Sequence, residues 1–163
     1  MINDEVKEPV ENNEVIENID LSVFNKKKFS INGNPDQIIE LDTSDLNILQ
    51  RIKDQYPVLE KLSKDVSDKV PNADGLTDEQ LLNTAADTLK DIDKRMRECI
   101  DIIFDSPVSD ICVPSGSMYD PVNGKFRFEH LIDVLISLYN DNLSKEVKKI
   151  QSRVSKHTSK YAR

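Results

Sequence analysis

The sequence predicts a mainly α-helical protein with about three principal amphipathic helices and a small N-terminal β-hairpin. Apolar residues recur every three or four positions over three long stretches, the pattern of a helix with one buried face. Two short runs of alternating apolar and polar residues flank a Gly-Asn-Pro-Asp turn near the beginning. Hydrophobic residues make up 37% and charged residues 32% of the 163 residues, which places the chain toward the polar edge of globular proteins.

Charge is distributed unevenly along the chain. The first twenty residues contain seven carboxylates and one Lys, with too few apolar anchors to offset the entropy of ordering, so residues 1–22 are predicted to be a disordered acidic arm. Residues 145–163 contain seven basic side chains and one Glu. The net charge of −8 disfavours bulk binding to nucleic acid or an anionic membrane. We expect residues 23–163 to form a single, mostly helical domain.

That domain should begin with a β-hairpin at residues 23–42. Phe29 and Ile31 alternate with polar neighbours before the turn, and Ile39 and Leu41 do so after it. An isolated hairpin is marginal in water, so this one should pack on a helix or extend the sheet of a partner.

The first helix is predicted at residues 45–66, after the capping side chains of residues 42–44. Its apolar stripe consists of Leu46, Leu49, Ile52, Tyr56, Leu59, Leu62 and Val66. Pro57 lacks an amide donor and clashes with the preceding turn, so we expect a kink or break before it, with Pro57 opening a second helical piece.

The second helix is predicted at residues 78–105, after a capping box formed by Thr77 and Gln80. Its stripe consists of Leu81, Ala85, Leu89, Ile92, Met96, Cys99 and Ile103. Ser106 and Pro107 should then cap and open one short helical turn.

A loop rich in Pro, Gly, Ser and Asp leads to the last helix, predicted at residues 126–160. Met118 and Tyr119 should anchor this loop against the helices. The first half of the helix is strongly apolar, whereas its second half is basic and thinly apolar, so we expect the end to project from the body.

No constellation of residues identifies a reaction, so we predict no catalytic, cofactor-binding or metal-binding residues and a protein that is not an enzyme. Asp91 and Asp93 diverge on a helix, so we interpret them as a solvated face. His130 lacks metal-ligand spacing and is interpreted as a partly buried or surface residue, and His157 as an exposed one. The basic tail fits a solvated helix end, a site for an acidic protein partner, or a nucleic-acid contact.

The N-terminal sequence MINDEVKEP has no basic and apolar leader pattern, and no run of about 18 apolar residues occurs. We therefore predict neither export nor membrane insertion. Cys99 and Cys112 are the two cysteines, and we expect both to be buried, reduced thiols.

The layout as a whole is similar to a known kind of protein. The hairpin leads into IIELDTSDLNILQRI, and DIDKRMRECIDIIFD is followed by the turn-rich SPVSDICVPSGSMYDPVNG, the apolar helix FRFEHLIDVLISLY and the basic RVSKHTSKYAR. Residues 23–163 thus resemble the small tail assembly chaperones of tailed bacteriophages, such as siphophages, and of prophages.

This resemblance implies a non-enzymatic protein of the host cytoplasm that binds the helical tape measure protein, helps to recruit tail tube subunits, and is absent from the finished virion. An amphipathic groove should shield the partner's apolar surface. We expect this groove to be formed by Ile100, Ile103, Phe104, Phe126, Phe128, Leu131, Leu135 and Leu138. The same residues at helical spacing are more often part of an intramolecular core.

Two other functions are open from the sequence. The first is a structural virion component, such as a head-to-tail or tail-tube accessory protein that stays in the particle. The weaker one is a regulatory protein that binds nucleic acid through its basic tail. The sequence predicts no particular oligomeric state.

Overall fold

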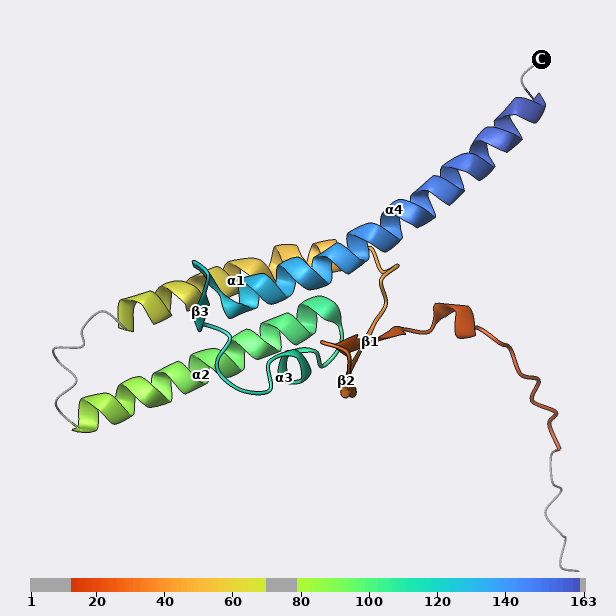
Figure 1. Cartoon of the computed structure of the whole chain (residues 1–163). Helices are drawn as coiled ribbons and strands as arrows, with labels where there is room; N and C mark the ends of the chain where they lie inside the picture. Colours follow the sequence, from red (N-terminus) through yellow and green to blue (C-terminus); the bar gives the residue numbers. More distant parts are fainter. Residues whose placement is uncertain (1–12, 70–78, 162–163) are drawn as a thin grey trace, which may run out of the picture.

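A computed structural model describes the backbone of residues 13–69 and 79–161, and side chains up to residue 154 and at 156. Three long helices dominate it: α1 (Ile48–Lys69), α2 (Glu79–Phe104) and α4 (Arg127–Tyr161). One short helix, α3 (Ser109–Cys112), lies between α2 and α4. Together with an N-terminal hairpin, this confirms the predicted mainly α-helical fold (Figure 1).

The predicted hairpin is formed by β1 (Lys27–Ile31) and β2 (Asn34–Leu41), which are antiparallel. Asn32 and Gly33 make the connection with φ angles of 53° and 70°, as an Asn-Gly turn does. Phe29 lies opposite Ile39, and the apolar face packs on the helical body, as expected. Before it, residues 13–21 have no regular structure and a single 3-10 turn, η1, spans Ser22–Phe24.

Helix α1 begins three residues later than predicted. The Asp45 carboxylate accepts a hydrogen bond from the Asn47 amide at 2.9 Å, and this turn ends before the helix starts. Ile48 is buried at the first helical position, whereas Leu46 and Leu49 are 64% and 65% exposed. The predicted stripe was therefore wrong at its first two positions.

Of the kink or break predicted before Pro57, the break is wrong, because α1 continues through Pro57 as one helix. Pro57 and Lys53, whose carbonyl loses its helical donor, are both exposed. Water can bind that carbonyl, and the buried residues Leu59 and Leu62 anchor the next turn in the core.

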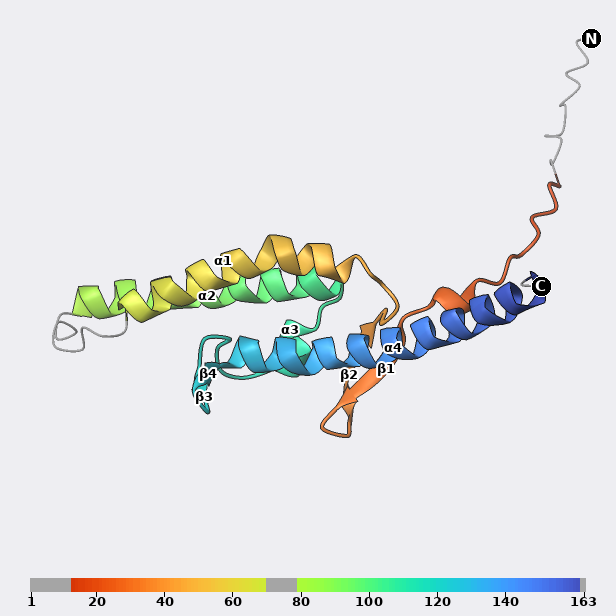
Figure 2. The same cartoon turned by 90° about the horizontal axis from the view of Figure 1, so that it is seen from above.

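The helices α1 and α2 run side by side in opposite directions, and α4 lies against them together with α3 and the hairpin (Figures 1 and 2). The rings of Phe104 and Tyr139 meet at the junction of α2 and α4, with centroids 6.1 Å apart. The largest fully buried apolar side chains are Tyr139, Phe104, Ile39, Leu41, Ile48, Leu59, Met96, Ile100, Ile103, Met118 and Val108.

Helix α2 ends in a Schellman motif. The Ser106 amide donates to the Asp101 carbonyl and the Asp105 amide to the Ile102 carbonyl, both at 3.2 Å, while Asp105 has a φ of 47°. The Nε atom of Arg51 donates to the Ile103 carbonyl at 2.8 Å, which ties α1 to this helix end.

The predicted cap of α3 by Ser106 is wrong. The Asp101 carboxylate of α2 instead accepts hydrogen bonds from the amide and hydroxyl of Ser109, at 2.8 and 3.0 Å. A neighbouring helix thus satisfies donors at the start of α3, a contact that local sequence rules do not predict.

Arg97 of α2 organises the loop that follows. Its guanidinium donates to the carbonyls of Val113 and Gly116, each at 2.9 Å, and to the carboxylates of Asp93 and Asp110 at 2.9 and 3.0 Å. Burial alone would lower the pKa of Arg97, but its carboxylate partners outweigh that effect and raise the pKa. Arg97 is therefore a fixed cation that holds the loop against α2.

The interpretation of Asp93 as a solvated side chain is wrong, whereas Asp91 is exposed as expected. The second oxygen of Asp93 accepts a hydrogen bond from the Met118 amide at 2.7 Å. Met118 is fully buried, which confirms that the loop is packed against the helices.

A second hairpin, formed by β3 (Pro121–Val122) and β4 (Lys125–Phe126), precedes α4. Asn123 and Gly124 turn it with φ angles of 51° and 80°. Helix α4 consequently starts at Arg127, one residue later than predicted. Its second half projects from the body, as expected (Figure 1).

We predict that Arg97→Met lowers the free energy of unfolding by about 2–4 kcal/mol, because it leaves one oxygen of the Asp93 carboxylate and two loop carbonyls without their donor. Denaturant unfolding followed by circular dichroism measures this. Arg95→Met is the matched control on the exposed side of α2, with an expected change below about 0.5 kcal/mol. Equal effects of the two substitutions would contradict the assigned role of Arg97.

Gly116 has a φ of +83°, and a Cβ there would collide with the guanidinium of Arg127 and the carboxylate of Asp120. Gly33 has a φ of +70° but open space around it. Both changes to Ala should cost about 1 kcal/mol in backbone strain, and Gly116→Ala should cost about 1 kcal/mol more through displaced hydrogen bonds. Thermal unfolding of the two variants compares them, and a smaller loss for Gly116→Ala would refute the crowding.

Candidate functional site

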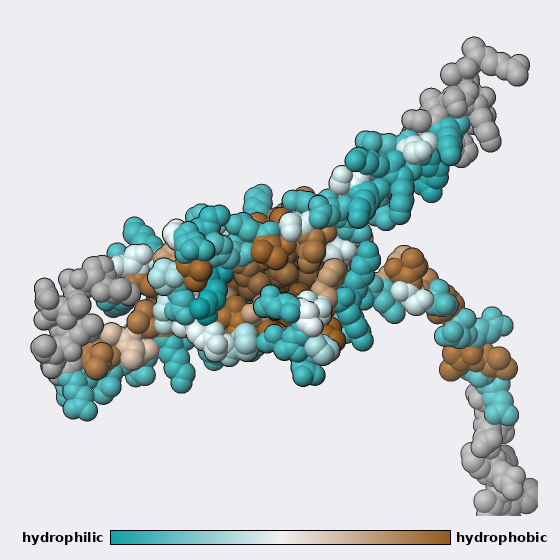
Figure 3. Space-filling view, in the orientation of Figure 1, coloured by the Kyte–Doolittle hydropathy of each residue, from teal (hydrophilic) through white to brown (hydrophobic). Residues whose placement is uncertain are grey.

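An apolar groove of about 650 Å³ lies between β1, the loop after α3, and the first half of α4. The apolar side chains over this part of α4 are visible as a brown area in the middle of the body (Figure 3). The groove is lined by Phe29, Ser30, Ile31, Asn32, Ile39, Cys112, Val113, Pro114, Ser115, Arg127, His130, Leu131, Val134, Leu135 and Leu138.

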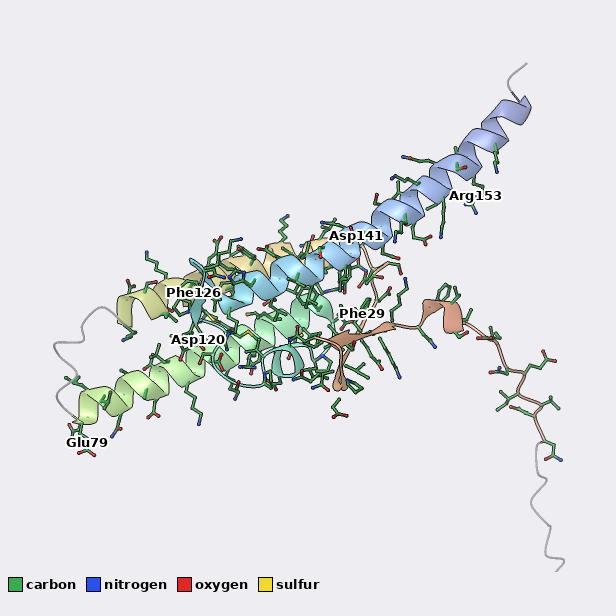
Figure 4. The ribbon with its side chains drawn as sticks, viewed as in Figure 1. Phe29, Glu79, Asp120, Phe126, Asp141 and Arg153 are labelled. Carbon is green, nitrogen blue, oxygen red and sulfur yellow. The ribbon has the colours of Figure 1, made fainter. Side chains whose placement is uncertain are left out.

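Polar contacts fix the end of the groove at the start of α4. Arg127 donates to the Ser115 carbonyl at 2.8 Å and lies 3.5 Å from the Asp120 carboxylate. His130 contacts the Val122 carbonyl through Nε2 at 2.6 Å, so the expectation of a half-buried residue holds. Figure 4 marks this end with Asp120 and the hairpin end with Phe29.

Asn142 fixes α4 near the hairpin. Its side-chain amide donates to the Thr43 carbonyl at 3.2 Å, and its oxygen accepts from Lys27 Nζ at 3.1 Å. Asn142 therefore joins α4 to β1 at one end of the groove, and Arg127 joins α4 to the loop at the other end.

The groove combines a buried floor with accessible walls. Ile39 and Leu135 are buried, Phe29 and Leu131 are half-buried, and Val134 is 62% exposed. Such an arrangement removes water from an apolar segment laid along it. Within the described residues β1 belongs to a two-stranded sheet, so its outer edge also offers backbone donors and acceptors.

The structure separates seven of the eight predicted partner-binding residues into two groups and leaves Phe126 outside both. Ile100, Ile103, Phe104 and Phe128 are at most 2% exposed and belong to the core between α2 and α4. Leu131, Leu135 and Leu138 line the groove. Phe126 is half-buried, and its ring stacks on Phe128 with centroids 5.9 Å apart.

The groove therefore lies between α4 and the hairpin, and α2 does not line it. Sequence reasoning missed Phe29, Ile31 and Val134 as groove residues. The alternation in β1 indicated that Phe29 and Ile31 share one apolar face. Val134 lies beside the apolar stripe of the last helix, and no local pattern marks it as a groove residue.

Cys112 lines the groove and is half-buried, whereas Cys99 is buried, and both are free thiols. Burial, with a smaller contribution from the negative charge of Asp101, raises the pKa of Cys112 to about 11. Burial also raises the pKa of Cys99. These shifts favour inert thiols over nucleophiles.

Residues 13–69 and 79–161 contain neither a cluster suited to a metal ion nor a helix suited to a membrane. No group of three or more His, Cys, Asp or Glu side chains in these ranges is placed to hold a metal ion. No helix in them is long and apolar enough to cross a membrane. The side chain of His157, and Thr77 of the predicted capping box, lie outside the described residues.

Comparison of the chain with protein-family models, curated proteins and solved structures finds no match.

The pKa of Cys112 predicts slow alkylation. At pH 8 the Cys112 thiol of a Cys99→Ala variant should react with iodoacetamide about 100-fold more slowly than the same thiol in denaturant, since its pKa is about 11 instead of 9.0. The rate should rise about tenfold per pH unit up to pH 10. Mass spectrometry of timed samples measures it, and a rate that levels off near pH 9 would contradict the shift.

Proposed function

We propose that this protein is a non-enzymatic binding protein whose groove holds an apolar segment of another protein, and that it acts as a phage tail assembly chaperone for the tape measure protein. The groove between β1 and α4 is the observation that carries the proposal, because it presents accessible apolar walls on a body whose elements are joined by hydrogen bonds of Arg127 and Asn142.

The chemistry of the groove indicates the kind of segment it binds. Its walls are apolar, with Arg127 and His130 at one end, so the occupant is an amphipathic helix that places its apolar face between β1 and α4. A tape measure protein is a long helical chain that requires such shielding before its tube assembles around it. The net charge of −8 keeps the complex soluble in the host cytoplasm.

A structural component of the virion is the second candidate function. The specific observation in its favour is the projecting half of α4, whose exposed apolar residues Val147, Ile150 and Val154 suit a lasting contact with another subunit. In this role the protein would remain in purified particles, whereas a chaperone would be absent from them.

Co-expression with the tape measure protein of the same genome tests the proposed function. We expect the tape measure protein to stay soluble only in the presence of this chain and to co-elute with it in size-exclusion chromatography. Precipitation of the tape measure protein regardless of this chain would refute the chaperone function.

Val134→Glu should abolish this co-elution while leaving the fold intact, because Val134 is 62% exposed and lies in a groove wall. A buried carboxylate in the bound state costs several kcal/mol, on the order of 100-fold in affinity or more. Val58→Glu is the matched control on α1, since Val58 is 42% exposed and does not line the groove. Circular dichroism verifies folding, and equal binding by both variants would exclude the groove as the site.

A further inference from the structure

The projecting half of α4 carries a second apolar surface, separate from the groove. Four residues spaced 4, 3 and 4 positions apart lie on one helix face, the spacing of a coiled-coil seam. The last three are 47%, 52% and 55% exposed, and the first is half-buried. We call this set the α4 stripe: Leu143, Val147, Ile150 and Val154.

The α4 stripe continues into a hollow of about 530 Å³ between α4 and the body. Leu143, Val147 and Ile150 form one side of it, and Val23 and Leu46 lie on the other side. A helix packed along the α4 stripe would therefore contact α4 over its length. At the end nearest the body it would also contact Val23 and Leu46.

We propose that the occupant of the α4 stripe is the same stripe of a second copy of this chain, running antiparallel. The spacing is self-complementary. With a two-fold axis between Val147 and Ile150, Val147 of one copy faces Ile150 of the other, and the reverse. The same axis opposes Leu143 to Val154. All four apolar layers are thereby filled in an isologous contact.

Charges beside the stripe favour this arrangement. Glu146 and Arg153 are seven residues apart and so flank the stripe on the same side of the helix. In the antiparallel dimer each Glu146 faces the Arg153 of the other copy, which makes two reciprocal ion pairs. Within one copy, Glu146 forms an exposed ion pair with Lys149 at 3.3 Å, which is of small energetic weight.

The remaining basic side chains are compatible with the dimer. Lys145, Lys148, Lys149 and Lys156 occupy helix positions turned away from the stripe, so they stay in water and do not oppose one another. The side of this half shown in Figure 3 is mainly hydrophilic, and Figure 4 shows Arg153 on the projecting half, beyond the body. In a parallel pair Glu146 would instead face Gln151 of the other copy, with no attraction between charges.

Four layers on one helix make a small interface, below the roughly 1,200 Å² of standard complexes, so the dimer should dissociate in the micromolar range. Sedimentation equilibrium of the full chain from about 5 to 500 µM covers the expected dissociation. A monomer throughout this range would overturn the proposal.

Charge reversal tests the orientation. Glu146→Arg and Arg153→Glu should each raise the dissociation constant about tenfold, because two attractions become two repulsions. The double variant should return to within about threefold of the wild type, since the pairs re-form with their signs exchanged. Lys148→Glu, the control with the same charge change as Arg153→Glu, should have no such effect.

Two outcomes besides a monomer would overturn the proposal. A dimer insensitive to Ile150→Asp would place the interface elsewhere, and single charge reversals that the double variant does not rescue would exclude the antiparallel pairing. None of these readouts involves the groove, so they are independent of tape measure binding.

Discussion

The position of the Arg97 guanidinium is the constraint on which most of the structure depends. Between α2 and α4 the chain runs for more than twenty residues with only one short helix and a minimal hairpin, so its backbone lacks most of the internal hydrogen bonds of regular elements. Arg97 supplies two of the missing hydrogen bonds, to the carbonyls of Val113 and Gly116. Asp93 and Asp101, one helical turn before and after Arg97, bind Arg97 and the Ser109 amide respectively. Buried Met118 and the start of α4 are positioned by this arrangement.

The same arrangement forms one wall of the groove. Val113 and Gly116, whose carbonyls Arg97 holds, bracket the loop segment that lines it. Arg127 contacts that segment from α4 through the Ser115 carbonyl. A polar network on α2 thus determines the shape of an apolar site that α2 itself does not line.

Hydrophobic periodicity was sufficient to predict the three helices and the hairpin. Periodicity was less reliable at the ends of these elements. The turn formed by Asp45 makes α1 begin later than predicted, and Ile48 is buried instead of Leu46 and Leu49. The Asn123-Gly124 turn was predictable in principle, because Asn-Gly is the strongest short signal for a hairpin. The contacts of Asp93 and Arg97 were not predictable, because their partners lie in a loop that has no hydrophobic periodicity.

The groove was the part least accessible from sequence. Periodicity indicates that Phe128 and Leu131 face inward, but not whether a neighbouring helix or an empty space lies opposite. Phe29 and Leu138 both line the groove although more than one hundred residues separate them in the sequence. No local sequence pattern indicates which residues so far apart in the chain lie in the same groove.

Helix α4 joins both surfaces in one stiff element. It contains no Gly or Pro from Arg127 to Tyr161, so nothing in it provides a hinge. Val134 in the groove and Ile150 in the α4 stripe are about 24 Å apart along the axis at 1.5 Å per residue. The groove and the α4 stripe are therefore held at a fixed separation on one element, and whatever occupies one surface is kept that far from whatever occupies the other.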